Sequence, residues 1–193
     1  MSRKTFSGNF TSSSPTVYSI AEQDSVCPTA TDRMSPSEQI ERAGAYHFLG
    51  LHDEAMECLD FLPDALRNDR DINVLRLSIL QGQSNWAGAA ALAKATLAAR
   101  PAAPEFYVMG AFAIRRQESL EAAHAFLRHG APFSETSAIW WYNLACYECC
   151  LGNLDRVEKL LGRAFLLDEI YRRIAELDDD LAPWREAQAD SGD

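Results

Sequence analysis

Three cysteines close together, Cys146, Cys149 and Cys150, are the side chains whose type and spacing most readily suggest chemistry. On a helix this spacing places the three thiols on one face, where they could bind a metal ion or act as redox-active thiols. A structural zinc site normally takes four ligands, and only Cys58 or His124, both distant in sequence, could approach to complete the set. Packing of small, polarisable side chains in a helix seam explains the trio more simply. No metal site is therefore predicted, and a thiol or metal sensor is kept as a third hypothesis.

The other candidate chemical groups do not form a recognisable active site. His47 and His52 flank a predicted turn, whereas His124 and His129 lie five residues apart, a poor spacing for two ligands on one helix face. Glu148 stands among apolar residues and would have a raised pKa if it were buried, but it is expected instead to be solvated or paired with an arginine, not to act as a catalytic acid. The sequence contains no glycine-rich phosphate loop, nucleophile elbow or His-Glu-x-x-His string. We therefore predict a protein that is not an enzyme and uses no cofactor.

Composition and charge argue against several classes of protein. With 18 Lys and Arg against 28 Asp and Glu, the 193-residue chain has a net charge of −10, which would repel the phosphates of nucleic acids. No apolar stretch approaches the ~20 residues that cross a bilayer, and the N-terminus lacks the apolar core of a secretory signal. Five cysteines, an odd number, fit reduced thiols better than a disulfide scaffold. A cytoplasmic protein with no nucleic-acid or membrane partner is predicted, and the acidic residues around 178–180 and 190–193 are interpreted as solvated.

An internal repeat of 34 residues reveals the elements that must position these side chains. Four segments align without gaps, at 50–55, 84–89, 118–123 and 152–157. Each is interpreted as a turn followed by the start of a second helix, and its last residue is small enough to let two antiparallel helices approach closely. These last residues are Ala55, Ala89, Ala123 and Val157. Their partners one helical turn later on the same face are Leu59, Ala93, Leu127 and Leu161.

The last repeat carries a tryptophan, a leucine, a small residue, a glycine with an aspartate, and an alanine at characteristic places. The positions are Trp141, Leu144, Ala145, Gly152, Asp155, Leu161 and Ala164. This pattern resembles the tetratricopeptide repeat, a unit of 34 residues that forms two helices and a tight turn. The resemblance covers about residues 36–188. The departures from the family pattern are Arg42, Arg76, Glu148, Val157 and Glu169.

The resemblance implies an all-α fold, a right-handed α–α superhelix of about four repeats with a C-terminal capping helix. The expected organisation is a flexible Ser/Thr-rich arm at 1–35, repeats at 36–69, 70–103, 104–137 and 138–169, a capping helix at 170–188 and an acidic tail at 189–193. Paired helices are predicted at 37–49, 53–66, 71–82, 86–99, 104–117, 120–130, 137–151 and 154–167. In the capping helix, Ile170, Ile174 and Leu177 are expected to face the last repeat.

The resemblance also implies a concave groove lined by the first helix of each repeat. Carried over by spacing, the groove residues are Ile40, His47, Val74, Gln81, Val108, Phe112, Arg115, Arg116, Tyr142, Asn143 and Cys146. Relatives that bind the acidic tails of heat-shock chaperones use a clamp of Lys and Asn, but here the matching positions hold Ile40, Val74 and Val108. Recognition of chaperone tails is therefore not expected. The groove is instead predicted to be mostly apolar, with Arg115 and Arg116 at one edge.

These features lead to a main hypothesis and one direct alternative. In the main hypothesis the chain is an adaptor or chaperone-like scaffold whose apolar groove binds a segment of another protein. In the alternative it is a self-assembling structural protein that forms homodimers through its repeats. The groove has three conceivable occupants: a partner peptide, a second copy of the chain, or the arm at 1–35 folded back onto it.

Overall fold

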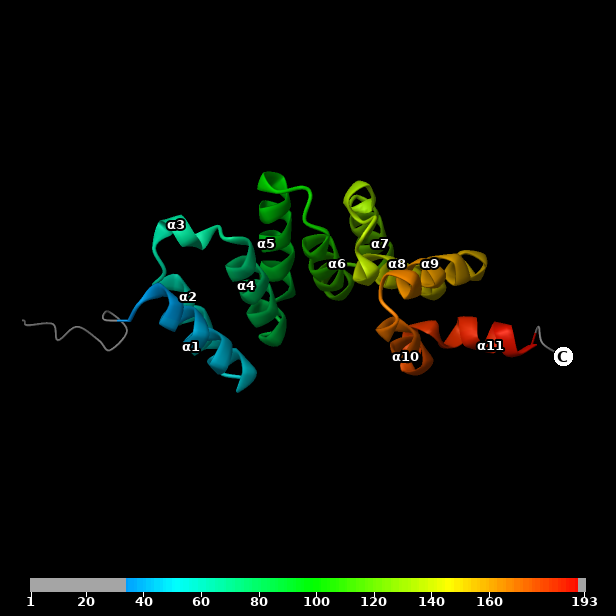
Figure 1. Cartoon of the computed structure of the whole chain (residues 1–193), viewed down its shortest axis with the longest axis horizontal. Helices are drawn as coiled ribbons and strands as arrows, with labels where there is room; N and C mark the ends of the chain where they lie inside the picture. Colours follow the sequence, from blue (N-terminus) through cyan, green and yellow to red (C-terminus); the bar gives the residue numbers. More distant parts are fainter. Residues whose placement is uncertain (1–33, 191–193) are drawn as a thin grey trace, which may run out of the picture.

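A computed structural model describes residues 34–190, and all regular secondary structure in this range is helical (Figure 1). The predicted arm, apart from its last two residues, and the end of the predicted acidic tail lie outside the described residues. The helices are α1 (Pro36–Phe48), α2 (His52–Asp60), α3 (Asp64–Arg67), α4 (Arg70–Gly82), α5 (Trp86–Ala99), α6 (Pro104–Gln117), α7 (Leu120–Arg128), α8 (Ala138–Cys150), α9 (Leu154–Leu167), α10 (Ile170–Leu177) and α11 (Ala182–Asp190). Two short 3₁₀ turns occur at Ala131–Phe133 and Asp179–Leu181. No helix within 34–190 is both long and apolar enough to cross a membrane.

The 34-residue spacing reappears in the backbone of the turns. Gly50 and Gly152 adopt left-handed φ angles of 76° and 79°, and Ser84 holds the equivalent position with φ 55°. A non-glycine residue pays about 1–2 kcal/mol for this conformation, which a tight turn between two packed helices can impose. The corresponding residue of the third turn, Glu118, has φ −120°, so that turn is built differently. The small residues predicted at the helix contacts, Ala55, Ala89, Ala123 and Val157, are all fully buried.

The helix predicted at 53–66 is wrong in its second half. α2 ends at Asp60, and the short helix α3 follows only after Pro63. Proline lacks the amide proton that a helix interior needs, and its ring clashes with the carbonyl four residues earlier. The other paired helices begin and end within two residues of their predicted bounds.

Two arginines donate to carbonyl groups at the early end of α2, although one of these groups, Leu59 O, also accepts from Leu62 N at 3.3 Å. Arg76 on α4 donates to Leu59 O and to Asp60 Oδ1, each at 2.7 Å. Arg67 donates to Leu62 O at 3.1 Å and to Asp60 O at 3.3 Å. Arg76 therefore departs from the repeat pattern because its guanidinium group bonds to the end of the neighbouring helix.

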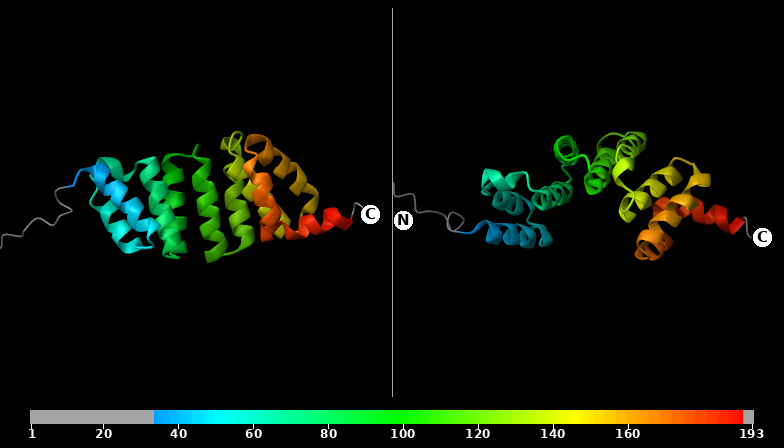
Figure 2. Two further views of the ribbon diagram at one scale, coloured as in Figure 1. Left: turned by 60° about the horizontal axis from the view of Figure 1, so that its bottom comes forward. Right: turned by 45° about the horizontal axis from the view of Figure 1, so that its top comes forward.

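The helix pairs follow one another along the long axis of the molecule, with α1 and α2 at one end and α10 and α11 at the other (Figures 1 and 2). α2 packs against α4, α5 against α6, and α6 against both α7 and α8. The right-hand view of Figure 2 shows the row bent into an arch whose two ends lie on the same side. The molecule is therefore an all-α helical-repeat solenoid, as predicted.

The buried apolar side chains form two clusters that meet at α4. The N-terminal cluster consists of Ala43, Ala55, Cys58, Leu59, Leu62, Ile72 and Ile79. The larger main cluster runs from Leu77 through α5–α9 to Leu181. Residues two apart on a helix point to nearly opposite sides, so α4 contributes Ile79 to one cluster and Leu77 to the other.

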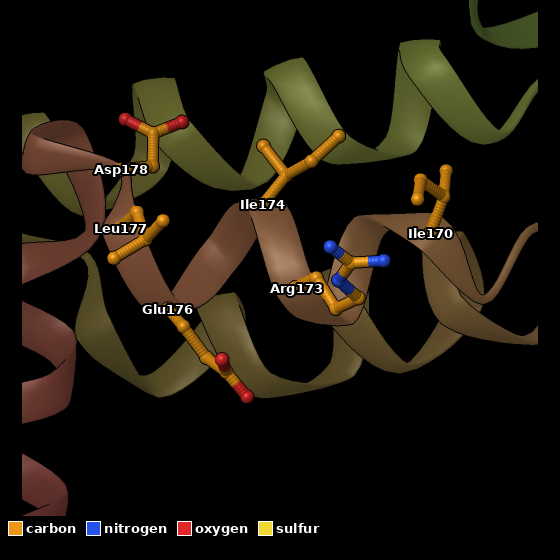
Figure 3. Close-up of a pocket in the computed structure, with 6 residues that line it drawn as sticks. All are labelled: Ile170, Arg173, Ile174, Glu176, Leu177 and Asp178. Atoms are coloured by element: carbon orange, nitrogen blue, oxygen red, sulfur yellow. The ribbon is translucent and has the colours of Figure 1, made fainter.

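The C-terminal segment differs from the predicted single capping helix. Residues 170–188 form α10, the 3₁₀ turn at 179–181 and most of α11. The expected packing of Ile170, Ile174 and Leu177 is wrong, because these side chains are 46%, 42% and 85% exposed. Ile170 and Ile174 instead project from the same side of α10 (Figure 3). Ala175 is the α10 residue that is buried, and Leu181, which is fully buried, covers α8.

Candidate functional site

A pocket of about 500 Å³ lies between α6 and α8, the first helices of two successive helix pairs. We call it the α6–α8 pocket. Nine residues line this pocket. Six of them were predicted from the sequence as groove residues, and three were not. The predicted six are Phe112, Arg115, Arg116, Tyr142, Asn143 and Cys146. The additional three are Tyr147, Asp178 and Asp180.

Arg115 is already paired within the molecule. Its guanidinium group contacts both carboxylate oxygens of Asp180, with Nη2 2.9 Å from Oδ1. The hydrogen bond from Arg115 holds the pKa of Asp180 below its ordinary value, and the same bond raises the pKa of Arg115. Both groups are therefore charged at neutral pH, and Arg115 is not free to bind an acidic residue of a ligand.

Asp178 forms a second link between the C-terminal segment and α8. Tyr142 donates its hydroxyl to Asp178 Oδ2 at 2.6 Å, and the Cys146 thiol lies 3.6 Å from the same oxygen. Burial, reinforced by Asp178, raises the pKa of Tyr142 and of Cys146. The acidic residues around 178–180 were expected to be solvated, but Asp178 and Asp180 line the α6–α8 pocket instead.

The cysteine trio has the properties of packed, protonated thiols. Cys146 and Cys149 are buried, and burial raises the pKa of each thiol. Burial also raises the pKa of the half-buried Cys150 to about 11, with Asp180 adding to the effect. A thiol with a raised pKa is a poor nucleophile and a poor metal ligand at neutral pH. Residues 34–190 hold no group of three or more side chains arranged to bind a metal ion.

Arg116 supplies the exposed cationic group of the pocket. Its guanidinium carbon lies 3.5 Å from the ring centroid of Phe112 and 5.1 Å from that of Trp86. The two rings pack edge to face, 5.9 Å between centroids. An arginine stacked on aromatic rings is held in place while its outer N–H groups still face solvent. Arg116 is thus oriented to bind an anionic group that enters the pocket.

The remaining predicted groove residues lie outside this pocket. Val108 is buried in the main cluster, Val74 packs partly buried against it, and Ile40 packs partly buried against the N-terminal cluster. Gln81 donates to Met109 O at 3.1 Å and so links α4 to α6. His47 contacts His52.

The sequence did not predict the buried network of polar side chains that surrounds Glu148 of α8. Glu148 is 4% exposed, and its carboxylate lies 3.0 Å from His124 Nε2, 2.7 Å from Asn153 Nδ2 and 3.5 Å from Arg156 Nη1. Burial alone would raise the pKa of Glu148, but these three partners outweigh it and lower the pKa below its ordinary value. The raised pKa considered for a buried Glu148 is therefore wrong, whereas the alternative of pairing with an arginine is confirmed by Arg156. The network joins α7, α8 and α9 around one ionised carboxylate.

Solved structures with a similar arrangement of helices include those of MamA, a tetratricopeptide-like protein. The double mutant MamA RS-1 ArsTM shares 15% identity over 71% of this chain and 77% of its own, with a TM-score of 0.57. MamA MSR-1 C2 shares 14% over 72% and 80%, with a TM-score of 0.53. A crystal structure of MamA protein shares 14% over 80% and 86%, with a TM-score of 0.57.

The chain has a tetratricopeptide-type fold. Neither a protein-family model nor a curated protein matches the sequence. The likeness thus rests on the arrangement of helices, and at 14–15% identity it extends to the fold alone.

The sequence missed the two aspartates because their pairing depends on tertiary structure. Asp180 lies 65 residues from Arg115, and Asp178 lies 36 residues from Tyr142. No repeat position predicts this approach, since residues 178–181 follow the last repeat. One signal was present in the sequence: the apolar Leu181 directly after the acidic run, which is unusual for a solvated tail.

Proposed function

We propose that the chain is a protein-interaction scaffold that binds a segment of a partner protein in the α6–α8 pocket, without catalysis. The observation that carries this proposal is the convergence of six predicted groove residues, from two successive first helices, on a single hollow surface. The fold supports it, because solenoids of this kind present extended concave surfaces suited to peptides.

The chemistry of the pocket narrows the kind of segment that would bind. The partly buried ring of Phe112 offers aromatic surface, and Arg116 offers the exposed positive charge. Arg115 is neutralised by Asp180. The preferred segment therefore carries one apolar or aromatic side chain next to one acidic residue, and it does not need a run of acidic residues.

The test compares quantitative pull-downs with the full chain, read by mass spectrometry. Arg116→Glu reverses the exposed charge, and Phe112→Ala removes the ring beneath it. The matched control is Arg128→Glu, which makes the same charge change at an exposed position of α7 outside the pocket. Partners retained by the wild type and by the control, but lost from both pocket variants, are the expected result. Equal retention by all four proteins would show that the pocket is not the binding site.

Self-association is the second candidate, and the exposed apolar side of α10 favours it. Ile170, Ile174 and Leu177 form a stripe that monomeric proteins usually cover. Light scattering over a series of concentrations should then show a mass that rises towards a dimer, and Ile174→Ser with Leu177→Ser should abolish the rise. A monomer mass at every concentration would rule this candidate out.

A further inference from the structure

Two histidines meet across the first turn of the solenoid. His47 lies in the last turn of α1, His52 is the first residue of α2, and Gly50 reverses the chain between them with its left-handed φ. The two Nδ1 atoms are 3.2 Å apart, and the ring centroids are 5.1 Å apart with the planes tilted by 45°. Both rings are partly buried, so their positions are defined by the surrounding helices.

A third element fixes the position of the His52 ring. A Cβ atom placed on Gly82, the last residue of α4, would lie 2.4 Å from Cε1 and 2.5 Å from Nε2 of His52. With any larger residue at 82, the imidazole would have to move from this position. The His52 ring is therefore held between the α1–α2 turn and the end of α4.

We propose that His47 and His52 together bind a divalent transition-metal ion, such as Zn²⁺ or Ni²⁺, through their Nδ1 atoms. Imidazole nitrogens bind Zn²⁺ at about 2.0–2.1 Å, so two of them at a tetrahedral ion are roughly 3.3–3.4 Å apart. The observed separation of 3.2 Å needs only a small adjustment. Imidazole suits both ions, and the order of affinities among first-row metals favours Ni²⁺ and Cu²⁺ at simple nitrogen sites.

The surroundings favour a cation and leave it accessible to water. A pocket of about 540 Å³ adjoins His52, and its lining includes Asp53 and Glu54 but not His47. Asp53 is held in place by Gln83, whose Nε2 donates to Oδ1 at 2.7 Å. Because 34–190 contains no set of three ligands, the ion takes two ligands from this chain and completes its coordination with water.

Calorimetric titration of the tag-free full chain with Ni²⁺, and separately with Zn²⁺, tests the proposal at pH 7.5. The expected result is one ion bound per chain, with affinity reduced at least ~10-fold in His47→Ala and in His52→Ala, since each removes one of two protein ligands. The matched control is His129→Ala, an exposed histidine that directly follows α7, and its titration should equal that of the wild type. No binding by the wild type, or wild-type affinity in either variant of the pair, would show that the two rings only hydrogen-bond to each other.

A further variant separates loss of the metal site from loss of the fold. Gly82→Ala keeps both imidazoles and favours helix at the end of α4, but its Cβ displaces the His52 ring. We expect an unchanged far-ultraviolet circular dichroism spectrum and weakened metal binding. Unchanged binding in this variant would contradict the proposed geometry.

Discussion

At the scale of single residues, the buried carboxylate of Glu148 shows how partners decide the charge of a side chain. Three polar neighbours stabilise its ionised form although it is almost wholly buried. We expect Glu148→Gln to lower the free energy of unfolding at pH 7 by about 1–3 kcal/mol, because hydrogen bonds to a charged acceptor are replaced by weaker ones. Urea denaturation at pH 7 measures the change, and Glu158→Gln, at an exposed position of α9, should leave the stability unaltered.

The same carboxylate predicts a pH dependence of stability. Its pKa in the folded protein lies below the ordinary value of 4.5, so the unfolded chain takes up a proton at higher pH than the folded protein does. The stabilisation is present above about pH 4.5 and is lost as the pH falls through the folded pKa. The difference in stability between wild type and Glu148→Gln should therefore shrink below pH 4.5. A difference that stays constant from pH 7 down to pH 3.5 would contradict a lowered pKa.

Six residues that line the α6–α8 pocket could be predicted from the sequence, but the side chains that pair with them could not. The 34-residue spacing brought Phe112 and Tyr142 to the correct helices, because the period determines which face of each first helix points inward. It gave no information on Arg115, whose charge is neutralised by Asp180 from beyond the last repeat. Long-range ion pairs depend on how non-repeating segments pack, and their residues carry no periodic signal.

At the scale of the elements, the end of α2 depends on a side chain from α4. The side chain of Arg76 is only 15% exposed and bonds to both Leu59 O and Asp60. Arg76→Ala removes the charged hydrogen bonds to Leu59 O and to the Asp60 carboxylate, so we expect the free energy of unfolding to fall by about 1–3 kcal/mol. Arg100→Ala, at an exposed position after α5, is the control and should change it by less than about 0.5 kcal/mol. Equal, small effects of both substitutions in urea denaturation would show that Arg76 does not stabilise this helix end.

Leu177 and Leu181 lie four residues apart in the C-terminal segment but differ in burial. Only the Leu181 side of this segment contributes to the hydrophobic core. Leu181 is fully buried against α8, whereas Leu177 is 85% exposed. Leu181→Ala should cost about 2–5 kcal/mol because it removes buried apolar volume from the main cluster. Leu177→Ala removes the same atoms from an exposed position and should cost little. Thermal unfolding of the two variants measures the contrast, and similar melting temperatures would contradict the packing of the 179–181 turn on α8.

Helix positions were largely predictable from the repeat, whereas helix ends depend on local chemistry. The step of 34 residues located each pair because small residues such as Ala89 and Ala123 recur where two helices touch. Pro63 was present in the sequence as a signal for the early end of α2, but the periodic pattern of the repeat was extended through it. The division of 170–188 had a similar signal in Pro183, which is the second residue of α11 and could not lie inside one continuous helix.

At the scale of the whole molecule, the two apolar clusters imply that the solenoid is not equally stable along its length. The N-terminal cluster contains seven buried residues, whereas the main cluster extends over α4–α9 and the C-terminal segment. Repeat proteins are stabilised mainly by contacts between neighbouring units, so a terminal unit with a small cluster can open while the rest stays folded. Amide hydrogen exchange should show protection in α1 and α2 at least ~10-fold lower than in α6, α8 and α9.

A pair of core substitutions tests whether this opening is local. Leu59 belongs to the N-terminal cluster and Leu161 to the main cluster, and both are fully buried one helical turn after the small residue of their helix pair. Leu59→Ala should raise exchange mainly in α1, α2 and the adjoining face of α4, because α4 is the element that the two clusters share. Leu161→Ala should instead raise exchange from α6 through α9, since the main cluster is continuous there. If Leu59→Ala accelerated exchange in α8 and α9 as much as in α1 and α2, the molecule would open as one cooperative unit. The two clusters would then not unfold independently of each other.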